Sequence, residues 1–114
     1  MHAEGSFAKL PVEEPYPGLQ RRSFDTSEAT VNEYTFRPTA AFPLHRHPQE
    51  QITLVLEGSV ELTVAGRRVG LQKGDWSVVG ADVEHSIRAG ADGAKILAIV
   101  VPRRDTPDAY TLVG

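Results

Sequence analysis

Cysteine is absent from the 114 residues of this chain, which excludes disulfide bonds, thiolate metal sites and thiol catalysis. Positive charge is not in excess either, and the formal net charge of -3 argues against nucleic acid as a partner. Long apolar runs are missing, and residues 1–10 lack the apolar core of a signal peptide. We therefore expect a cytoplasmic protein with neither a membrane nor a nucleic-acid partner.

Helical periodicity is also missing, and short segments of strand composition alternate with turn residues at even spacing. This pattern is typical of an all-β sandwich or barrel, and the length suits one domain. Residues 1–18 contain three prolines and are expected to form an extended arm, with the barrel domain at residues 19–114. We expect strands at residues 19–24, 31–36, 41–47, 51–56, 59–64, 67–71, 76–79, 85–89 and 95–101.

The expected strand at residues 51–56 has apolar side chains on both faces. Gln51 and its alternate neighbours share one face, while Ile52 and Leu54 lie on the other. If Gln51 faces an internal site, a second sheet or another subunit must cover the Ile52 face. Together with the arm, this favours a homodimer formed by strand exchange or edge pairing.

Two histidines, His45 and His47, lie one residue apart within the segment at residues 42–58. In an extended segment both rings point to the same side. Neutral imidazole is the commonest protein ligand for a divalent transition metal, and an oxygen donor, Glu50 or Gln51, follows shortly after. Taken alone, however, such a pair is more commonly two hydrogen-bonded surface histidines.

The spacing around these histidines resembles the first motif of the cupin family. After His47 come three residues and then Gln51, where the family usually has Glu; six more residues lead to Gly58. Thr39 stands where the motif opens with Gly. Both spacers fit the motif if Gln51 takes the Glu position.

The second cupin motif is also partly present. Gly74 and His85 occupy their positions, whereas the Pro, the second Gly and the Asn of the motif are absent. The resemblance covers residues 17–110, and the two motifs together are more specific than either alone. A third histidine and a spaced Gln make a metal site a better interpretation than surface histidines.

The resemblance implies a single-domain cupin-type β-barrel, which is a double-stranded β-helix or jelly roll. It also implies one divalent transition metal ion, with Zn, Ni, Fe and Mn left open, and the metal ligands His45, His47, Gln51 and His85. Glu50 is the rival oxygen ligand, because a bulge after Pro48 would exchange the directions of Glu50 and Gln51. Motif spacing favours Gln51. Its neutral amide would leave the ion its full charge, which favours Lewis-acid chemistry over dioxygen activation.

Within the cupins, the chain is similar to the small pectin-degradation group that linearises unsaturated uronates. This implies a metal-dependent lyase or isomerase that acts on a small carboxylated or sugar-derived substrate. Those enzymes carry a catalytic acid on the last strand, where this chain has Ala98. They also carry an Arg two positions after a proline, and this pair is kept here as Pro102 and Arg104. The resemblance therefore gives Arg104 a catalytic position, although composition alone predicts a solvated tail charge. Glu50 is the candidate to replace the missing acid.

Two other functions remain open at this stage. One is a metal-dependent dioxygenase, as in other cupins, which would contain iron or copper. The other is a non-enzymatic barrel that binds or senses a small molecule, and it is compatible with the apolar last strand at residues 95–101.

Overall fold

Antiparallel strands make up almost all the regular structure of the computed structural model, which describes residues 1–106 and 108–114. One turn of 3-10 helix, η1 (Phe7–Lys9), precedes them. The all-β prediction is thus confirmed. The strands are β1 (Glu13–Tyr16), β2 (Leu19–Asp25), β3 (Thr30–Phe36), β4 (Ala41–Arg46), β5 (Glu50–Val64), β6 (Arg67–Gln72), β7 (Trp76–Val79), β8 (His85–Val101) and β9 (Thr111–Leu112).

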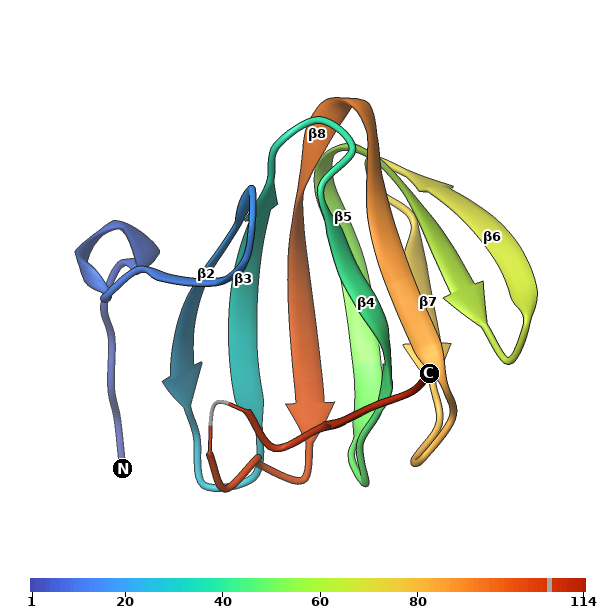
Figure 1. Cartoon of the computed structure of the whole chain (residues 1–114). Coiled ribbons are helices and arrows are strands. Elements are labelled where there is room, and N and C mark those ends of the chain that lie inside the picture. Colours follow the sequence, from blue (N-terminus) through green and yellow to red (C-terminus); the bar gives the residue numbers. More distant parts are fainter. Residues whose placement is uncertain (107) are drawn as a thin grey trace.

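The two long strands, β5 and β8, pair with each other and connect the two walls of the barrel (Figure 1). In the first wall, the later half of β8 lies between β3 and the first half of β5, and β7 and β2 extend it. In the second wall, the early half of β8 lies between β4 and the later half of β5, and β6 extends it. The side chains between the walls form the core.

Both long strands correct the strand prediction, which divided each of them in two. Pairing continues past Gly58 in β5 and past residues 90–93 in β8, with bulges at residues 55–57 and 58–60. Figure 1 shows each strand bending sharply near its middle, at the same end of the molecule. Gly58 and Gly93 have φ angles of 71° and 74°, which only glycine adopts without strain. The predicted turn at residues 90–93 is therefore a bend that keeps the ladder intact.

The alternation predicted for the strand that contains Gln51 is confirmed. Thr53 and Val55 are buried between the walls, whereas Ile52 and Leu54 are half-buried on the outer face. Cross-strand register extends this outer face over five strands, because directly opposed residues point to the same side of a sheet. One row across it comprises Val78, Ile52, Ile99, Val31 and Phe24.

A second row on the same face begins with Trp76, Leu54 and Leu97. Trp76 is 66% exposed and Val78 is 51% exposed. Adjacent apolar side chains with this much exposure are typical of an association surface rather than of a solvated sheet. The homodimer stays a prediction, and this face is where we expect a second copy to pack.

The segment at residues 1–18, predicted as an extended arm, lies against β2. Glu13 in β1 pairs with Arg21, and the Phe7 ring packs on Phe24 with 5.6 Å between centroids. The turn η1 interrupts the expected extended conformation. The boundary between arm and barrel at residue 18 stays a prediction. Among the described residues, no helix has the length and apolar character needed to cross a bilayer.

Replacing Gly58 by Ala should destabilise the fold. An added Cβ would overlap the carbonyl oxygen of Gly93, and the φ angle of 71° is unfavourable for Ala. Gly66→Ala is the matched control, because Gly66 has a φ angle of 80° but open space around it. The control should lower the free energy of unfolding by about 1–2 kcal/mol. Gly58→Ala should lower it by about 1–3 kcal/mol more, measured by urea denaturation. Equal losses would contradict the close approach of the two bends.

Light scattering at micromolar concentration should give a dimeric mass for the wild-type chain. Val78→Lys should shift the mass towards the monomer, because it places a charge within the exposed apolar rows. Val12→Lys, at another exposed valine on the arm, should leave the dimer intact. A monomeric wild-type protein would rule out the homodimer, and dissociation by Val12→Lys alone would assign the contact to the arm instead.

Candidate metal centre

Three buried histidines meet at one end of the space between the walls. His45 lies near the end of β4, His47 follows that strand, and His85 begins β8. His45 and His85 are direct cross-strand partners, with ring centroids 4.1 Å apart. Each ring offers one nitrogen, and the three nitrogens lie within 4.8 Å of one another. The structure thus brings together the three histidines that the motif spacing selects.

Each of these rings is oriented by a backbone carbonyl two residues away. A carbonyl oxygen can only accept, so every Nδ1 carries the proton and donates it. In a neutral imidazole the other nitrogen, Nε2, then has a free lone pair. The three donor–acceptor distances are 2.8 Å for His45 to Pro43, 2.9 Å for His47 to Gln49 and 2.8 Å for His85 to Val83.

Burial keeps two of the rings neutral at physiological pH. Burial, together with the neighbouring His85, lowers the pKa of His45 to about 3. Burial likewise lowers the pKa of His85 to about 4, although the hydrogen bond to Val83 opposes the shift. Both values lie well below pH 7, so the Nε2 lone pairs of His45 and His85 are available to a cation.

Gln51 completes the group from the opposite wall. Its amide Nε2 donates to the Thr53 hydroxyl at 3.1 Å, which turns the amide oxygen towards the histidines. That oxygen lies 3.1 Å from His47 Nε2 and 3.3 Å from His85 Nε2. In a neutral ring whose proton lies on Nδ1, Nε2 presents a lone pair to this oxygen, and a cation at the centre of the group would relieve the resulting repulsion. Three imidazoles and one amide oxygen therefore fit a divalent transition metal ion.

Glu50, the rival oxygen donor, lies elsewhere. It is exposed at the first position of β5, opposite Val101. It belongs neither to the histidine group nor to the described lining of the adjoining cavity. The strand alternation that turns Gln51 inward turns Glu50 outward.

A cavity of about 40 Å³ adjoins the histidines, which is room for a few water molecules. Tyr110 closes one side of it: its ring lies 5.4 Å from the His45 ring, and its hydroxyl is 2.8 Å from that of Tyr16. Besides His45, His47 and Gln51, the cavity is lined by Arg21, Asn32, Tyr34, Phe42, Gln49, Val100, Arg104, Ala109 and Tyr110.

Several lining residues were missed by the sequence analysis, Arg21 above all. Arg21 is only 2% exposed and lies two positions after the buried Leu19 in β2, so strand alternation was the signal that could have found it. Arg104 is not the solvated tail charge that composition predicted, because it is half-buried and lines the cavity. Ala98 is buried on β8, and its carbonyl accepts a hydrogen bond from Asn32 at 3.1 Å.

The fold and the site together define a class: a small β-barrel protein with a histidine-rich centre suited to a metal ion. The chain belongs to the cupin family, since the family described as cupin domain matches residues 32–101, more than half of its length. The cupin resemblance inferred from the two motifs is thereby confirmed.

Individual proteins of known sequence or structure are similar to this chain to different extents. Quercetin 2,3-dioxygenase of Bacillus subtilis (strain 168) is 32% identical over 75 residues, which is 65% of this chain. The match spans only 22% of that protein. KdgF from Halomonas sp. is 26% identical, with a TM-score of 0.79 over 90% of this chain and 97% of its own. An RmlC-like cupin from Shewanella frigidimarina NCIMB 400 has a TM-score of 0.83 over 92% of this chain and 95% of its own, but at 23% identity it supports the fold alone.

Thr53→Val should weaken metal binding without loss of a ligand. Valine keeps the volume of threonine but cannot hold the Gln51 amide, so the amide oxygen is no longer directed at the histidines. Affinity for Zn²⁺ or Ni²⁺, measured by competition with a chelator, should fall about 10-fold. Thr63→Val, on the same strand away from the site, is the control. Equal affinities in the two variants would show that Thr53 does not orient Gln51.

Proposed function

We propose that this cupin is a metal-dependent enzyme of the lyase or isomerase type, acting on a small carboxylated or sugar-derived substrate. The observation that carries the proposal is the uncharged donor set, in which His45, His47, His85 and Gln51 converge from both walls. These four residues would hold one divalent transition metal ion. Because they are all neutral, the bound ion would keep its full charge and supply Lewis-acid polarisation of a substrate oxygen.

The surrounding residues would hold the substrate and exclude water. Phe42 and Val100 give the cavity an apolar side, and the Tyr16–Tyr110 pair covers it. Burial raises the pKa of Tyr34, so its hydroxyl stays protonated at neutral pH and serves as a neutral hydrogen-bonding group. These features favour stabilisation of developing negative charge on an oxygen.

No carboxylate is positioned to act as a general base in the described part of the cavity. None of the residues in the described lining of the cavity is Asp or Glu, and Ala98 occupies the position of the acid in the uronate-linearising cupins. Glu50, predicted as a replacement, is exposed and outside the lining. We therefore propose the general reaction class rather than uronate linearisation itself, with proton transfer left to the substrate or to water.

A dioxygenase is the second candidate. It is favoured by the 32% identity to quercetin 2,3-dioxygenase of Bacillus subtilis (strain 168). The match covers about a fifth of that protein, so its activity is a proposal here and no more. Against it stands the neutral Gln51 beside the histidines, which is less suited than a carboxylate to stabilise a higher oxidation state of a metal.

Elemental analysis of the purified protein should find one divalent transition metal ion per chain. His47→Ala and His85→Ala should each lose most of the ion, since each removes a nitrogen donor. Gln51→Ala should lower metal affinity more than Glu50→Ala, which is the matched control one residue away. Full metal content in His85→Ala, or a larger loss in Glu50→Ala, would refute the ligand set.

The metal-loaded protein then separates the candidate reactions. Conversion of a 4,5-unsaturated uronate or another small sugar acid without oxygen uptake would support the lyase or isomerase. Oxygen uptake with quercetin and a redox-active metal would support the dioxygenase instead. Stabilisation against melting by sugar acids, with turnover of none of them, would support a binding or sensing protein.

A further inference from the structure

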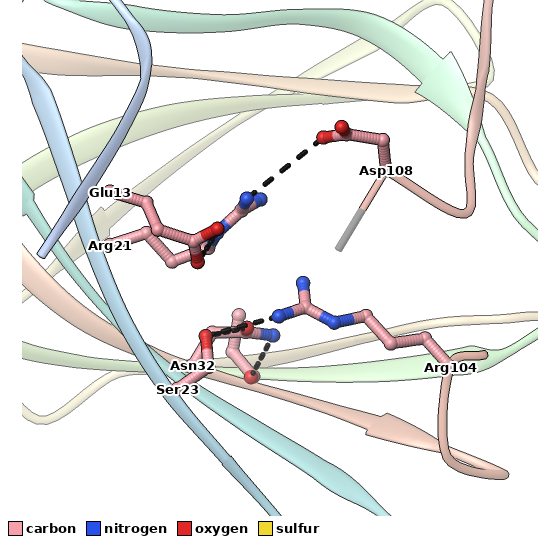
Figure 2. Close-up of polar contacts among 7 residues, drawn as sticks. Glu13, Arg21, Ser23, Asn32, Arg104 and Asp108 are labelled. Atoms are coloured by element: carbon pink, nitrogen blue, oxygen red, sulfur yellow. Dashed lines mark hydrogen bonds and ion pairs between the residues drawn. The ribbon is translucent and has the colours of Figure 1, made fainter. Parts of the chain in front are cut away.

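Two arginines, one buried and one half-buried, reach the cavity from separate parts of the chain. Arg21 comes from β2, and Arg104 follows the end of β8. Both line the cavity that contains His45 and Gln51. Figure 2 shows the two guanidinium groups entering the same region from opposite sides. Withdrawing two like charges from water beside a candidate metal centre is costly, even where one of them is only half-buried, and this placement requires an explanation.

The acids that pair with Arg21 lie outside the described lining of the cavity. Arg21 Nε donates to Glu13 at 3.2 Å, and its Nη2 lies 4.0 Å from an oxygen of Asp108, a residue whose side chain is 80% exposed. Neither acid belongs to the described lining. The inner side of the cavity is therefore electropositive, even though Arg21 has ionic partners on its outer side.

The contacts of Arg104 include two hydroxyl side chains. Its Nη2 donates to the Ser23 hydroxyl at 3.1 Å, and Ser23 donates to Asn32 at 2.7 Å. Its backbone N–H donates to the Thr30 hydroxyl at 3.1 Å. Burial and the facing Arg21 lower the pKa of Arg104, which records the repulsion between the two cations. A guanidinium does not lose its proton in proteins, so an anion is the group that would relieve this repulsion.

We propose that Arg21 and Arg104 form an anion subsite that binds the carboxylate of the substrate, with the remainder of the molecule facing the histidines. This inference rests on the proposed function, because it places the substrate of that same site. A planar carboxylate matches the donor fork of a guanidinium better than a compact neutral group does. The ligand class is thus a small organic acid with a second oxygen function. Neutral sugars and diols of the same size are excluded as preferred ligands.

Pairs of probes that differ only in the carboxylate test the subsite. Binding of glycolate against ethylene glycol, and of galacturonate against galactose, is measured by calorimetry on the metal-loaded full chain. The acids should bind at least about 10-fold more tightly than their neutral partners. A bound metal ion would also increase the affinity for an acid, so arginine variants are needed to show whether the arginines cause the preference.

Arg21→Gln and Arg104→Gln should each weaken acid binding about 10-fold or more while metal content stays unchanged. Arg104→Lys should restore part of the affinity, because it returns the charge without the fork. Arg103→Gln, at the exposed neighbour of Arg104, should bind acids as the wild type does. Since Arg21 also holds Glu13, Arg21→Gln counts only if its melting temperature and metal content match the wild type; otherwise Arg104→Gln decides.

The possible outcomes separate the subsite from the metal centre. A normal metal content with equal binding of acids and neutral partners would overturn the subsite and leave the proposed function standing. Unchanged acid affinity in Arg104→Gln, or an equal loss in Arg103→Gln, would also overturn it. Arginine-dependent binding of acids by a protein that holds no metal would support the subsite and refute the metal-dependent function.

Discussion

The hydrogen bonds from three histidine Nδ1 atoms to backbone carbonyls are the interaction on which the site depends. Each bond uses a carbonyl two residues from its histidine, so ring orientation is set locally by the backbone. With the protons on Nδ1, Nε2 is the ligand atom of each neutral ring, and one ligand nitrogen from each of the three rings lies within 4.8 Å of the other two. The Gln51 oxygen faces this group because Thr53 holds the other end of its amide. Burying four lone-pair donors that face one another costs free energy, and a cation bound between them would offset that cost.

The two long strands make this convergence possible. β5 and β8 pair with each other on both sides of their bends, so each contributes to both walls. Gly58 permits the two bends to touch, because a side chain there would overlap the carbonyl of Gly93, and a side chain at Gly93 would overlap the carbonyl of Phe36 in β3. As a result, the amide oxygen of Gln51 from one wall faces His85, which begins β8 in the other wall, and His47, which follows β4. Gln51 and Ala98 stand where the resemblance to other cupins leads us to expect acidic residues. No acid is present in the described lining of the cavity, to which Arg21 and Arg104 contribute positive charge.

Much of the fold and part of the site could be predicted from local pattern. Alternation in the strands placed Thr53 and Val55 inside and Ile52 outside, and turn residues marked most strand ends correctly. The prediction divided β5 at Gly58, taken as the end of a strand, and β8 at residues 90–93, taken as a turn, whereas cross-strand pairing continues through both places. Arg21 was missed because a charged residue within a strand is usually solvated. Its burial depends on Glu13, whose strand β1 returns along β2.

The sequence by itself determined the all-β class, the alternation of sides along each strand, and the placing of His45 and His47 on one side. These follow from a two-residue period that needs no knowledge of distant parts of the chain. The preference for Gln51 over Glu50 came instead from the resemblance to the cupin motif, since alternation says only that the two side chains point to opposite sides. Only the tertiary structure decided that His85 lies against His45, and that Arg21 and Arg104 share a cavity with them. The reason is physical: local backbone geometry fixes direction, but distances between remote segments depend on strand register, on the bends at Gly58 and Gly93, and on the path of the chain after β8.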